Sequence, residues 1–418
     1  MTSGDAEKPA ATLPADKAAM PTLLVAVLVV FAAQQLLTPI LAPLSRELGL
    51  TETQLGLVLT VSAVALTVTS HLWGRALDAF GRRNVLAAGL GLATLGLAGF
   101  AVAAVLGLDG AAGPGATFGL MLVTRSVLFG AGIAAIPVVA LATAAATTTT
   151  EAERTRAVGL VGAAQGLALV IGPAAGGALS VVSLTLPLYA APTATAVLTL
   201  WVLLRVPRVP VVRPKAPRAA DVRPWDRRVL PMLTVGFLLY LSLGLVQIVV
   251  GFLLADRLDL DPQATAGAAS IALVTAGVVL VLVQGVLVPR LRWTPARLLR
   301  VGTPIAVAAY LLLAAAGALW SITLAFGVLA LGLGLAIPGY TAAPTLLVGP
   351  EQQGSVAGLV SAATGATFIV GPLLGTALYT TRPLAPILTA AGAACLAWLV
   401  VWVVRPPKKP IEVPESAP

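Results

Sequence analysis

One arginine lies deep inside a long apolar stretch, where a charged side chain needs a partner. Arg125 stands about nine residues into the segment that begins near residue 116, or roughly 13 Å along a helix. In a membrane core about 30 Å thick, that depth is close to the middle. A charge there costs about 2.5–3.5 kcal/mol. We therefore expect Arg125 to face a cavity and to recognise a neutral or anionic group; the alternative is an arginine held only by backbone carbonyls.

Neutral hydrogen-bonding side chains occur at a similar depth in other apolar stretches. They are Gln34, Gln35, Gln165 and Tyr240, while Gln247 lies nearer the outer end of its stretch. Each of them alone is explained by a hydrogen bond between neighbouring helices. Their clustering at one depth favours the other interpretation, in which these five side chains and Arg125 line a ligand-binding site.

The residue types that catalysis needs are scarce. His71 and Cys395 are the single histidine and the single cysteine, so no His/Cys metal cluster can form, and neither a metal nor a cofactor is expected. All 17 acids lie outside the apolar stretches, which leaves no paired carboxylates for an enzyme embedded in a membrane. The candidates for proton transfer are Asp78 and His71, because imidazoles titrate near physiological pH.

The composition is that of an integral membrane protein. Of 418 residues, 58% are hydrophobic and 10% are charged, and the mean hydropathy is +0.97. A soluble domain has about 25% charged residues. Apolar stretches long enough to span a bilayer are predicted at 22–44, 54–77, 84–106, 116–144, 156–180, 186–205, 229–254, 264–288, 300–316, 319–345, 355–379 and 384–404.

The basic residues predict an orientation. When the N-terminus is placed in the cytoplasm, 22 of the 26 Lys and Arg residues fall in cytoplasmic segments and three fall on the other side. This asymmetry is what the positive-inside rule expects. We therefore expect both termini in the cytoplasm, and we interpret the high pI of about 10.3 as an orientation signal rather than a sign of nucleic-acid binding.

A repeat divides the chain into two halves. Gly172-Pro173 and Gly176 recur 199 residues later as Gly371-Pro372 and Gly375, on either side of a Pro-rich basic segment. Parallel repeats of this kind are typical of secondary transporters. The expected domains are a cytoplasmic tail at 1–21, a six-helix bundle at 22–205, a cytoplasmic linker at 206–228, a second six-helix bundle at 229–404 and a cytoplasmic tail at 405–418.

The segment from Gly74 to Arg83 joins the second and third spans. Gly81 allows a tight turn, and we expect Gly74 to let a neighbouring helix approach closely. The segment resembles the loop signature of the major facilitator superfamily. The resemblance implies an all-α membrane protein with 12 transmembrane helices in two pseudo-symmetric bundles around a central cavity. It also implies a conformational latch, formed by Gly74, Asp78, Gly81, Arg82 and Arg83.

Two further motifs carry the same resemblance. The equivalent loop of the second half, from Gly285 to Arg290, keeps a glycine and a base but lacks the acid. In the fourth span, Arg125 precedes Gly130 and Gly132, so the glycines come one residue later than in the pattern of that family.

The fifth span is rich in glycine. Gly159, Gly162, Gly166, Pro173 and Gly177 fall within a narrow arc of a helix. Such a face permits close helix packing, and the proline bends the helix. The pattern resembles the drug:proton antiporter branch of the superfamily. We expect Gly172, Pro173 and Gly176, with Gly371 and Pro372 in the second half, to provide helix packing and kinks.

Together these observations predict a transporter in the plasma membrane. The main hypothesis is export of a small lipophilic or weakly anionic molecule by alternating access, with proton coupling left open. A facilitator or uptake carrier for a small organic solute is the alternative, and a membrane-embedded enzyme is disfavoured. The expected partners are the substrate, the lipid bilayer and protons; a monomer is expected, with no nucleic acid.

Overall fold

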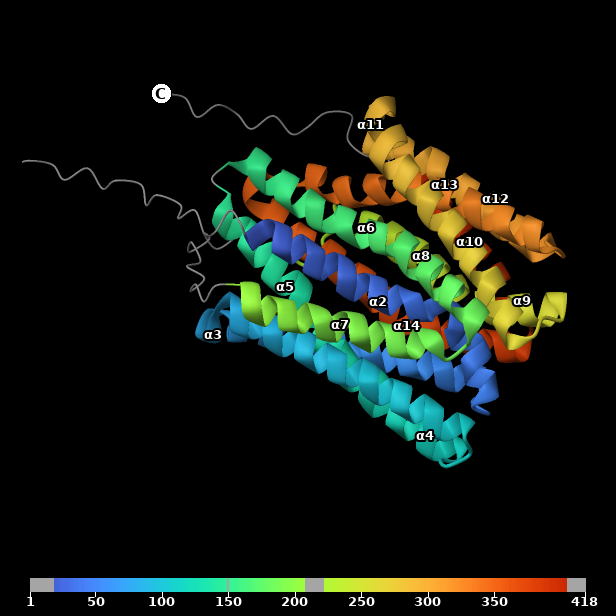
Figure 1. The fold of residues 1–418 in the computed structure, drawn as a ribbon. Coiled ribbons are helices and arrows are strands. Elements are labelled where there is room, and N and C mark those ends of the chain that lie inside the picture. Colours follow the sequence, from blue (N-terminus) through green and yellow to red (C-terminus); the bar gives the residue numbers. More distant parts are fainter. Residues whose placement is uncertain (1–18, 149, 207–221, 404–418) are drawn as a thin grey trace, which may run out of the picture.

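The computed structural model describes residues 19–148, 150–206 and 222–403, and this part of the chain is helical without strands. The expected tails and most of the expected linker lie outside the described residues. The first half comprises α2 (Ala19–Glu47), α3 (Glu52–Leu108), α4 (Pro114–Met121), the π-helical η1 (Leu122–Leu128), α5 (Phe129–Thr147), α6 (Glu151–Val182) and α7 (Leu186–Arg205) (Figure 1).

The second half begins with a span that is broken in two. It comprises α8 (Leu230–Gln247), α9 (Val250–Leu258), α10 (Pro262–Leu282), the π-helical η2 (Val283–Leu287), α11 (Val288–Leu291), α12 (Pro295–Ala315), α13 (Leu319–Ala342), the 3-10 helices η3 (Pro344–Leu347) and η4 (Pro350–Gln352), α14 (Gln353–Thr381) and α15 (Ala385–Val403).

Eleven of the described helices are long and apolar enough to cross a membrane. One of them, α3, has 57 residues and contains Gly81 with φ 76°, a left-handed conformation that glycine adopts without strain. The arms on either side of Gly81, residues 52–80 and 82–108, are each about 40 Å long at 1.5 Å per residue, enough for one crossing of a core about 30 Å thick. The twelve predicted spans are therefore present, and Gly81 makes the turn between the second and third.

Two predicted spans differ from the structure in detail. The seventh was expected to be continuous over 229–254, but the helix breaks after Gln247 and resumes at Val250. β-Branched residues crowd the break, which lowers the cost of leaving the helix there. The ninth span begins at Pro295 rather than at residue 300. Its first turn is capped by Thr294, whose hydroxyl accepts from the backbone N–H of Arg297.

Small residues bring the helices of each half together in matching ways. A Cβ at Gly132 of α5 would lie 2.6 Å from the carbonyl oxygen of Gly89 in α3. In the second half, a Cβ at Gly302 of α12 would lie 2.5 Å from the carbonyl oxygen of Gly332 in α13. These contacts leave no room for a side chain, so glycine is required at both places.

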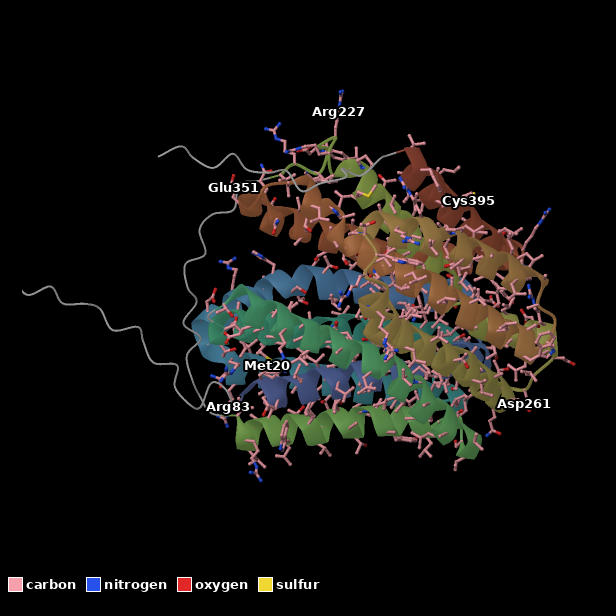
Figure 2. The ribbon with its side chains drawn as sticks, turned by 90° about the horizontal axis from the view of Figure 1, so that it is seen from above. Met20, Arg83, Arg227, Asp261, Glu351 and Cys395 are labelled. Carbon is pink, nitrogen blue, oxygen red and sulfur yellow. The ribbon has the colours of Figure 1, made fainter. Side chains whose placement is uncertain are left out.

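The two halves meet at one end of the molecule. The other end holds Met20 and Arg83 of the first half and Glu351 of the second, as labelled in Figure 2; we call it the linker face. The end that holds Asp261 is the opposite face. Towards the opposite face, the Thr60 hydroxyl of α3 donates to the carbonyl oxygen of Ile369 in α14 at 2.8 Å.

A second contact between the halves joins α6 and α10. A Cβ at Gly277 of α10 would lie 2.9 Å from the carbonyl oxygen of Leu169, and a Cβ at Gly177 would collide with Ser270. Nearer the linker face, Gly159 and Gly162 of α6 and Gly358 of α14 would meet no atom within 4 Å. The halves are thus packed together towards the opposite face and open towards the linker face.

Candidate functional site

Arg125 is buried within the fourth span, 2% exposed, and belongs to the π-helical segment η1. A π-turn takes up one more residue than an α-turn. Segment η1 covers most of the stretch from Arg125 to Gly130. In that stretch this chain has one residue more than the pattern of the superfamily that it resembles. The extra residue is therefore absorbed as a local widening of the helix.

The surroundings of the Arg125 guanidinium are apolar. It lies over the Phe129 ring, 4.5 Å from the centroid. Its Nε and Nη1 atoms are buried, and no residue in the described part of the chain accepts a hydrogen bond from them. Among the described residues, no backbone carbonyl accepts a hydrogen bond from Nε or Nη1 of Arg125, so the alternative of an arginine held by carbonyls is not seen. Cation–π attraction alone compensates only part of the desolvation of a guanidinium.

Three of the four glutamines predicted for the site come from two helices of the first half. Gln34 and Gln35 in α2 and Gln165 in α6 are half-buried, and their amides make no hydrogen bond to any described residue. A Cβ at Gly172 of α6 would lie 2.5 Å from the Cβ of Gln35, so Gly172 is what lets Gln35 sit against α6. Amides without a protein partner are free to bind a solute or water.

Tyr240 is part of an aromatic cluster in the second half. Its ring centroid lies 6.1 Å from that of Tyr340 in α13 and 6.3 Å from that of Phe368 in α14. The Tyr340 hydroxyl donates to the carbonyl oxygen of Val360 at 3.1 Å. Sequence reasoning placed Tyr240 in the site but missed Phe368, because an isolated phenylalanine in an apolar helix carries no distinguishing signal.

The structure does not join all the predicted residues. Arg125 makes its ring contact with Phe129, and no hydrogen bond or ring contact links it to the glutamines or to Tyr240 within the described residues. Gln247 is half-buried at the last residue of α8, directly before the break in the seventh span. Direct contacts therefore do not join these residues in this conformation, and the shared site stays a prediction.

An ionic cluster at the opposite face was not predicted. Arg46, at the end of α2, pairs with Asp256 of α9, with 3.0 Å between Nη2 and Oδ2, and with Glu52 at 3.1 Å. The Tyr379 hydroxyl of α14 donates to Asp256 at 2.7 Å. Burial raises the pKa of Asp256, but the hydrogen bonds from Arg46 and Tyr379 outweigh it and hold that pKa below its usual value.

This cluster, which we call the opposite-face lock, connects the two halves. Arg46 and Glu52 belong to the first half, and Asp256 and Tyr379 to the second. The Arg46 guanidinium also lies 5.0 Å from the ring centroid of Phe252. Asp256 lies in α9, beyond the apolar stretch of the seventh span, and faces Arg46 across the boundary between the halves.

The expected latch segment has a mixed outcome. Gly81 makes the turn, and Arg83 donates to the carbonyl oxygen of Leu203 in α7. Arg82 is buried, 3% exposed, whereas Asp78 and His71 are exposed. Gly74 was expected to admit a neighbouring helix, but a Cβ there would meet no atom within 4 Å. No helix approaches Gly74 in this conformation, so its expected role stays a prediction.

The glycine face of the fifth span is used only in part. A Cβ at Gly176 would collide with the carbonyl oxygen of Leu36 in α2, so α2 and α6 touch closely there. Gly159, Gly162 and Gly166 would meet no atom, contrary to the expectation of one continuous packing face. The close packing is confined to the half of α6 nearer the opposite face.

The second half repeats the packed part of this arrangement. A Cβ at Gly371 of α14 would lie 3.1 Å from the Cα of Gly244 in α8, and a Cβ at Gly375 would lie 2.5 Å from the carbonyl oxygen of Leu245. Pro173 and Pro372 lie inside α6 and α14 respectively. Each proline removes one hydrogen bond from its helix, which lets the helix bend.

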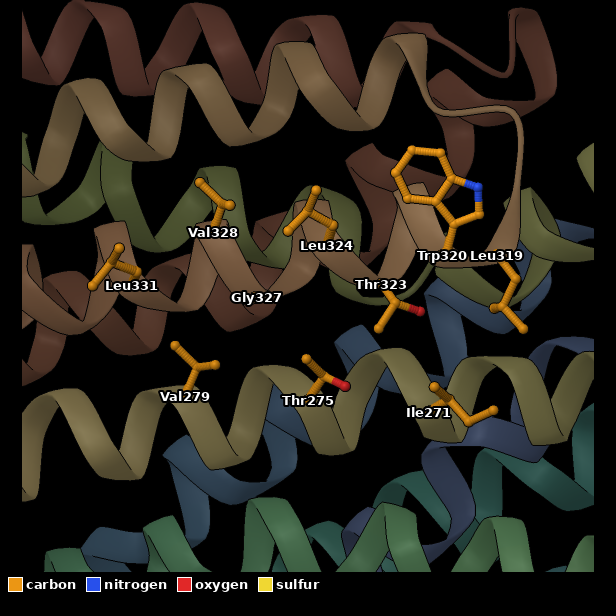
Figure 3. A pocket seen from close by; sticks show the side chains of 10 residues that line it. All are labelled: Ile271, Thr275, Val279, Leu319, Trp320, Thr323, Leu324, Gly327, Val328 and Leu331. Atoms are coloured by element: carbon orange, nitrogen blue, oxygen red, sulfur yellow. The ribbon is translucent and has the colours of Figure 1, made fainter.

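Two grooves lie away from the predicted site residues. A groove of about 1020 Å³ runs between α10 and α13 on an outer flank of the second half, where Thr275 and Thr323 are its polar side chains (Figure 3). A smaller one lies between α3 and α7. Neither is lined by a predicted site residue, and both are open and apolar. Within the described residues no group of His, Cys, Asp and Glu side chains could hold a metal ion.

Two halves built of apolar helices, packed together at one end and apart at the other, have the arrangement of a membrane carrier. The family model described as Major Facilitator Superfamily matches residues 23–360, and the chain belongs to that superfamily. It is therefore a multi-pass membrane transporter and not an enzyme. Figure 1 shows the corresponding arrangement of its helices.

Several similar proteins are named for drug resistance. The chain is 24% identical over 388 residues to the quinolone resistance protein NorA of Staphylococcus aureus, covering 91% of this chain and 94% of NorA. It is 27% identical over 365 residues to multidrug resistance protein 1 of Bacillus subtilis, covering 85% and 88%. A 161-residue match to the puromycin resistance protein pur8 of Streptomyces alboniger is 34% identical but spans only 37% of this chain and 29% of pur8.

Solved structures share the fold at low identity. A mutant form of the nucleoside transporter NupG superposes with a TM-score of 0.70 at 14% identity, covering 92% of this chain and 99% of NupG. The human organic anion transporter MFSD10 gives 0.64 at 18% identity, covering 93% and 100%. A bacterial homologue of ferroportin in its inward-facing state gives 0.67 at 16% identity, covering 92% and 98%. Similarity at this level establishes the fold alone.

Proposed function

We propose that this transporter exports a small lipophilic or weakly anionic molecule by alternating access. It works as a monomer in the plasma membrane, with the linker face and both termini in the cytoplasm. The basic residues of the linker face support the orientation. The drug-resistance names of relatives aligned along most of the chain support export.

The proposed preference for a neutral or anionic substrate rests on the surroundings of Arg125. It is buried, its Nε and Nη1 lack acceptors among the described residues, and no carboxylate there pairs with it. An uncompensated guanidinium favours a ligand that supplies a negative charge or a hydrogen-bond acceptor, and disfavours a permanent cation. The remaining binding groups in this proposal are Gln34, Gln35, Gln165, Tyr240 and Gln247, which contribute neutral hydrogen bonds.

The alternating-access step is supported by the unequal packing of the two faces. In the conformation described, the opposite face is closed by the lock and by glycine packing, and the linker face is open. Gly74 and Gly159 present bare backbone surface with no neighbour. In the proposed cycle, the linker-face ends of the halves close onto such surfaces, and Asp78, Gly81, Arg82 and Arg83 latch that state. Asp78 and His71 are the proposed proton carriers.

Accumulation of a fluorescent or radiolabelled compound in cells with and without the protein tests the proposal. Export lowers accumulation, whereas the alternative of uptake raises it. A proton uncoupler added to the same cells should abolish the difference if transport is proton-coupled. The compound panel should contain neutral, weakly anionic and permanently cationic molecules of similar size, because the proposal ranks them by charge.

The decisive variant is Arg125→Ala. It should abolish transport with unchanged membrane insertion, since it removes a costly charge from the bilayer core. Arg125→Lys should rescue poorly, because a point charge does not replace a planar five-donor fork. The exposed Arg227→Ala, outside the site and the latch segment, is the control and should transport normally. Robust transport by Arg125→Ala, or a wild-type preference for permanent organic cations, would overturn the proposal.

A further inference from the structure

Four arginines gather where α11 meets α12, at the linker face of the second half (Figure 1). They are Arg290, Arg292, Arg297 and Arg300, and we call them the arginine corner. The sequence from residue 262 to residue 350 contains no acid at all, so the local chain supplies four positive charges and no negative one.

The geometry of the arginine corner is that of an interfacial site. Arg297 lies over the Trp293 ring, 4.4 Å from its centroid, and Arg300 lies over the Trp402 ring at 4.8 Å. The Nε of Arg300 is buried without a hydrogen-bond partner among the described residues. None of the four arginines forms an ion pair within the described part of the chain. Trp402 is 54% exposed.

The first half shows what the arginine corner lacks. Its equivalent loop makes its turn at Gly81 with φ 76°, and the second-half loop turns at Arg292 with φ 47°. Matching these two turns aligns Asp78 with Pro289. The carboxylate that stands beside the arginines of the first loop is therefore replaced by a proline in the second. The negative charge that balances the second loop must come from another molecule or from a distant segment.

We propose that the arginine corner binds the phosphate of an anionic phospholipid in the leaflet at the linker face. Guanidinium groups match phosphate oxygens with paired hydrogen bonds. Tryptophans such as Trp293 and Trp402 take the headgroup level of a bilayer. Trp293 packs against a buried apolar cluster of Val283, Leu298 and Leu335, which holds its ring in place. One helical turn before Arg290, Val286 is 40% exposed and offers apolar surface to an acyl chain.

Native mass spectrometry of the detergent-solubilised full-length protein tests the proposal. Phosphatidylglycerol and phosphatidylcholine of equal chain length are added, and the retained lipids are counted. The wild type should retain phosphatidylglycerol in preference. Each basic residue near a membrane surface contributes roughly a fivefold preference, so the double variant Arg290→Gln/Arg297→Gln should lose about 25-fold. Both arginines are exposed, so the fold should persist. Arg290→Lys/Arg297→Lys keeps the charges but not the paired hydrogen bonds, and it should retain only part of the binding.

The controls separate this site from general positive charge. Arg223→Gln/Arg227→Gln removes two exposed charges from the same face and should leave retention unchanged. Millimolar inorganic phosphate should not displace the lipid, since it lacks the acyl chains. The proposal is overturned if Arg223→Gln/Arg227→Gln loses as much lipid as Arg290→Gln/Arg297→Gln, or if free phosphate displaces the lipid completely. It is also overturned if lipid binds only after the acids of the C-terminal tail are removed by Glu412→Gln/Glu415→Gln. The last result would make the tail the occupant.

Discussion

Removing the charge of Asp256 should open the opposite face. The Arg46–Asp256 pair is 35% and 39% exposed at its two side chains, so solvent screens it. Exposed pairs contribute about 0.2–1 kcal/mol. Asp256→Asn also weakens the charged hydrogen bond from Tyr379. We estimate a total of about 1 kcal/mol, which changes the ratio of closed to open opposite faces roughly fivefold.

Distance measurements between spin labels can report this ratio. Labels at Asp109→Cys in the first half and Arg382→Cys in the second lie on exposed residues of the opposite face, with Cys395→Ser as the background. Asp256→Asn should increase the population at long distance. Transport should also change, because the lock must break and re-form in each proposed cycle.

The matched control is Asp259→Asn. Asp259 is exposed, forms no ion pair with a described residue, and has φ 49°, a conformation that asparagine also tolerates. The control should leave the distance distribution as in the wild type. Swapping the charges in Arg46→Asp/Asp256→Arg should restore part of the closed population. An unchanged distribution in Asp256→Asn, or an equal shift in Asp259→Asn, would refute the idea that this pair holds the face closed.

Two further predictions follow from the same structure. Gly176→Ala should lower the melting temperature of the purified protein, at a cost of about 1–3 kcal/mol, because the added Cβ meets the Leu36 carbonyl oxygen. Gly159→Ala places its Cβ in open space and should leave the melting temperature unchanged. Equal losses of melting temperature in the two variants would contradict the packing described. The pKa of Asp256 lies below its usual value, so the ionised pair with Arg46 persists above about pH 4 and weakens only at lower pH. The distances between the spin labels should therefore stay the same from about pH 8 to about pH 5.5. A change of distance in that range that Asp256→Asn abolishes would contradict this prediction.

The spans could be predicted from the sequence because each is an apolar run long enough to cross a bilayer. Arg125 could be singled out for the same reason, since a charge in such a run is costly wherever the helix points. Its depth follows from counting residues, and its burial was confirmed at 2% exposed. The turn at Gly81 was also predicted, because few residues other than glycine adopt its left-handed conformation.

Long-range pairings could not be predicted. Arg46 and Asp256 are 210 residues apart, and nothing near either residue marks the other. Both stand in short charged segments that look like ordinary loops. The glycines near the linker face are a different case. Whether Gly159 and Gly162 pack against another helix depends on the conformation, and the same sequence must be compatible with every conformation of the transport cycle.

The widened turn at Arg125 affects how this chain is compared with its relatives. Segment η1 carries its extra residue without lengthening the path of the fourth span across the membrane. A column-by-column alignment that opens no gap between Leu122 and Leu128 is therefore out of step by one position on one side of the segment. Functional residues transferred through such an alignment would be assigned to the wrong neighbour, and the error would rotate them by about 100° around the helix axis.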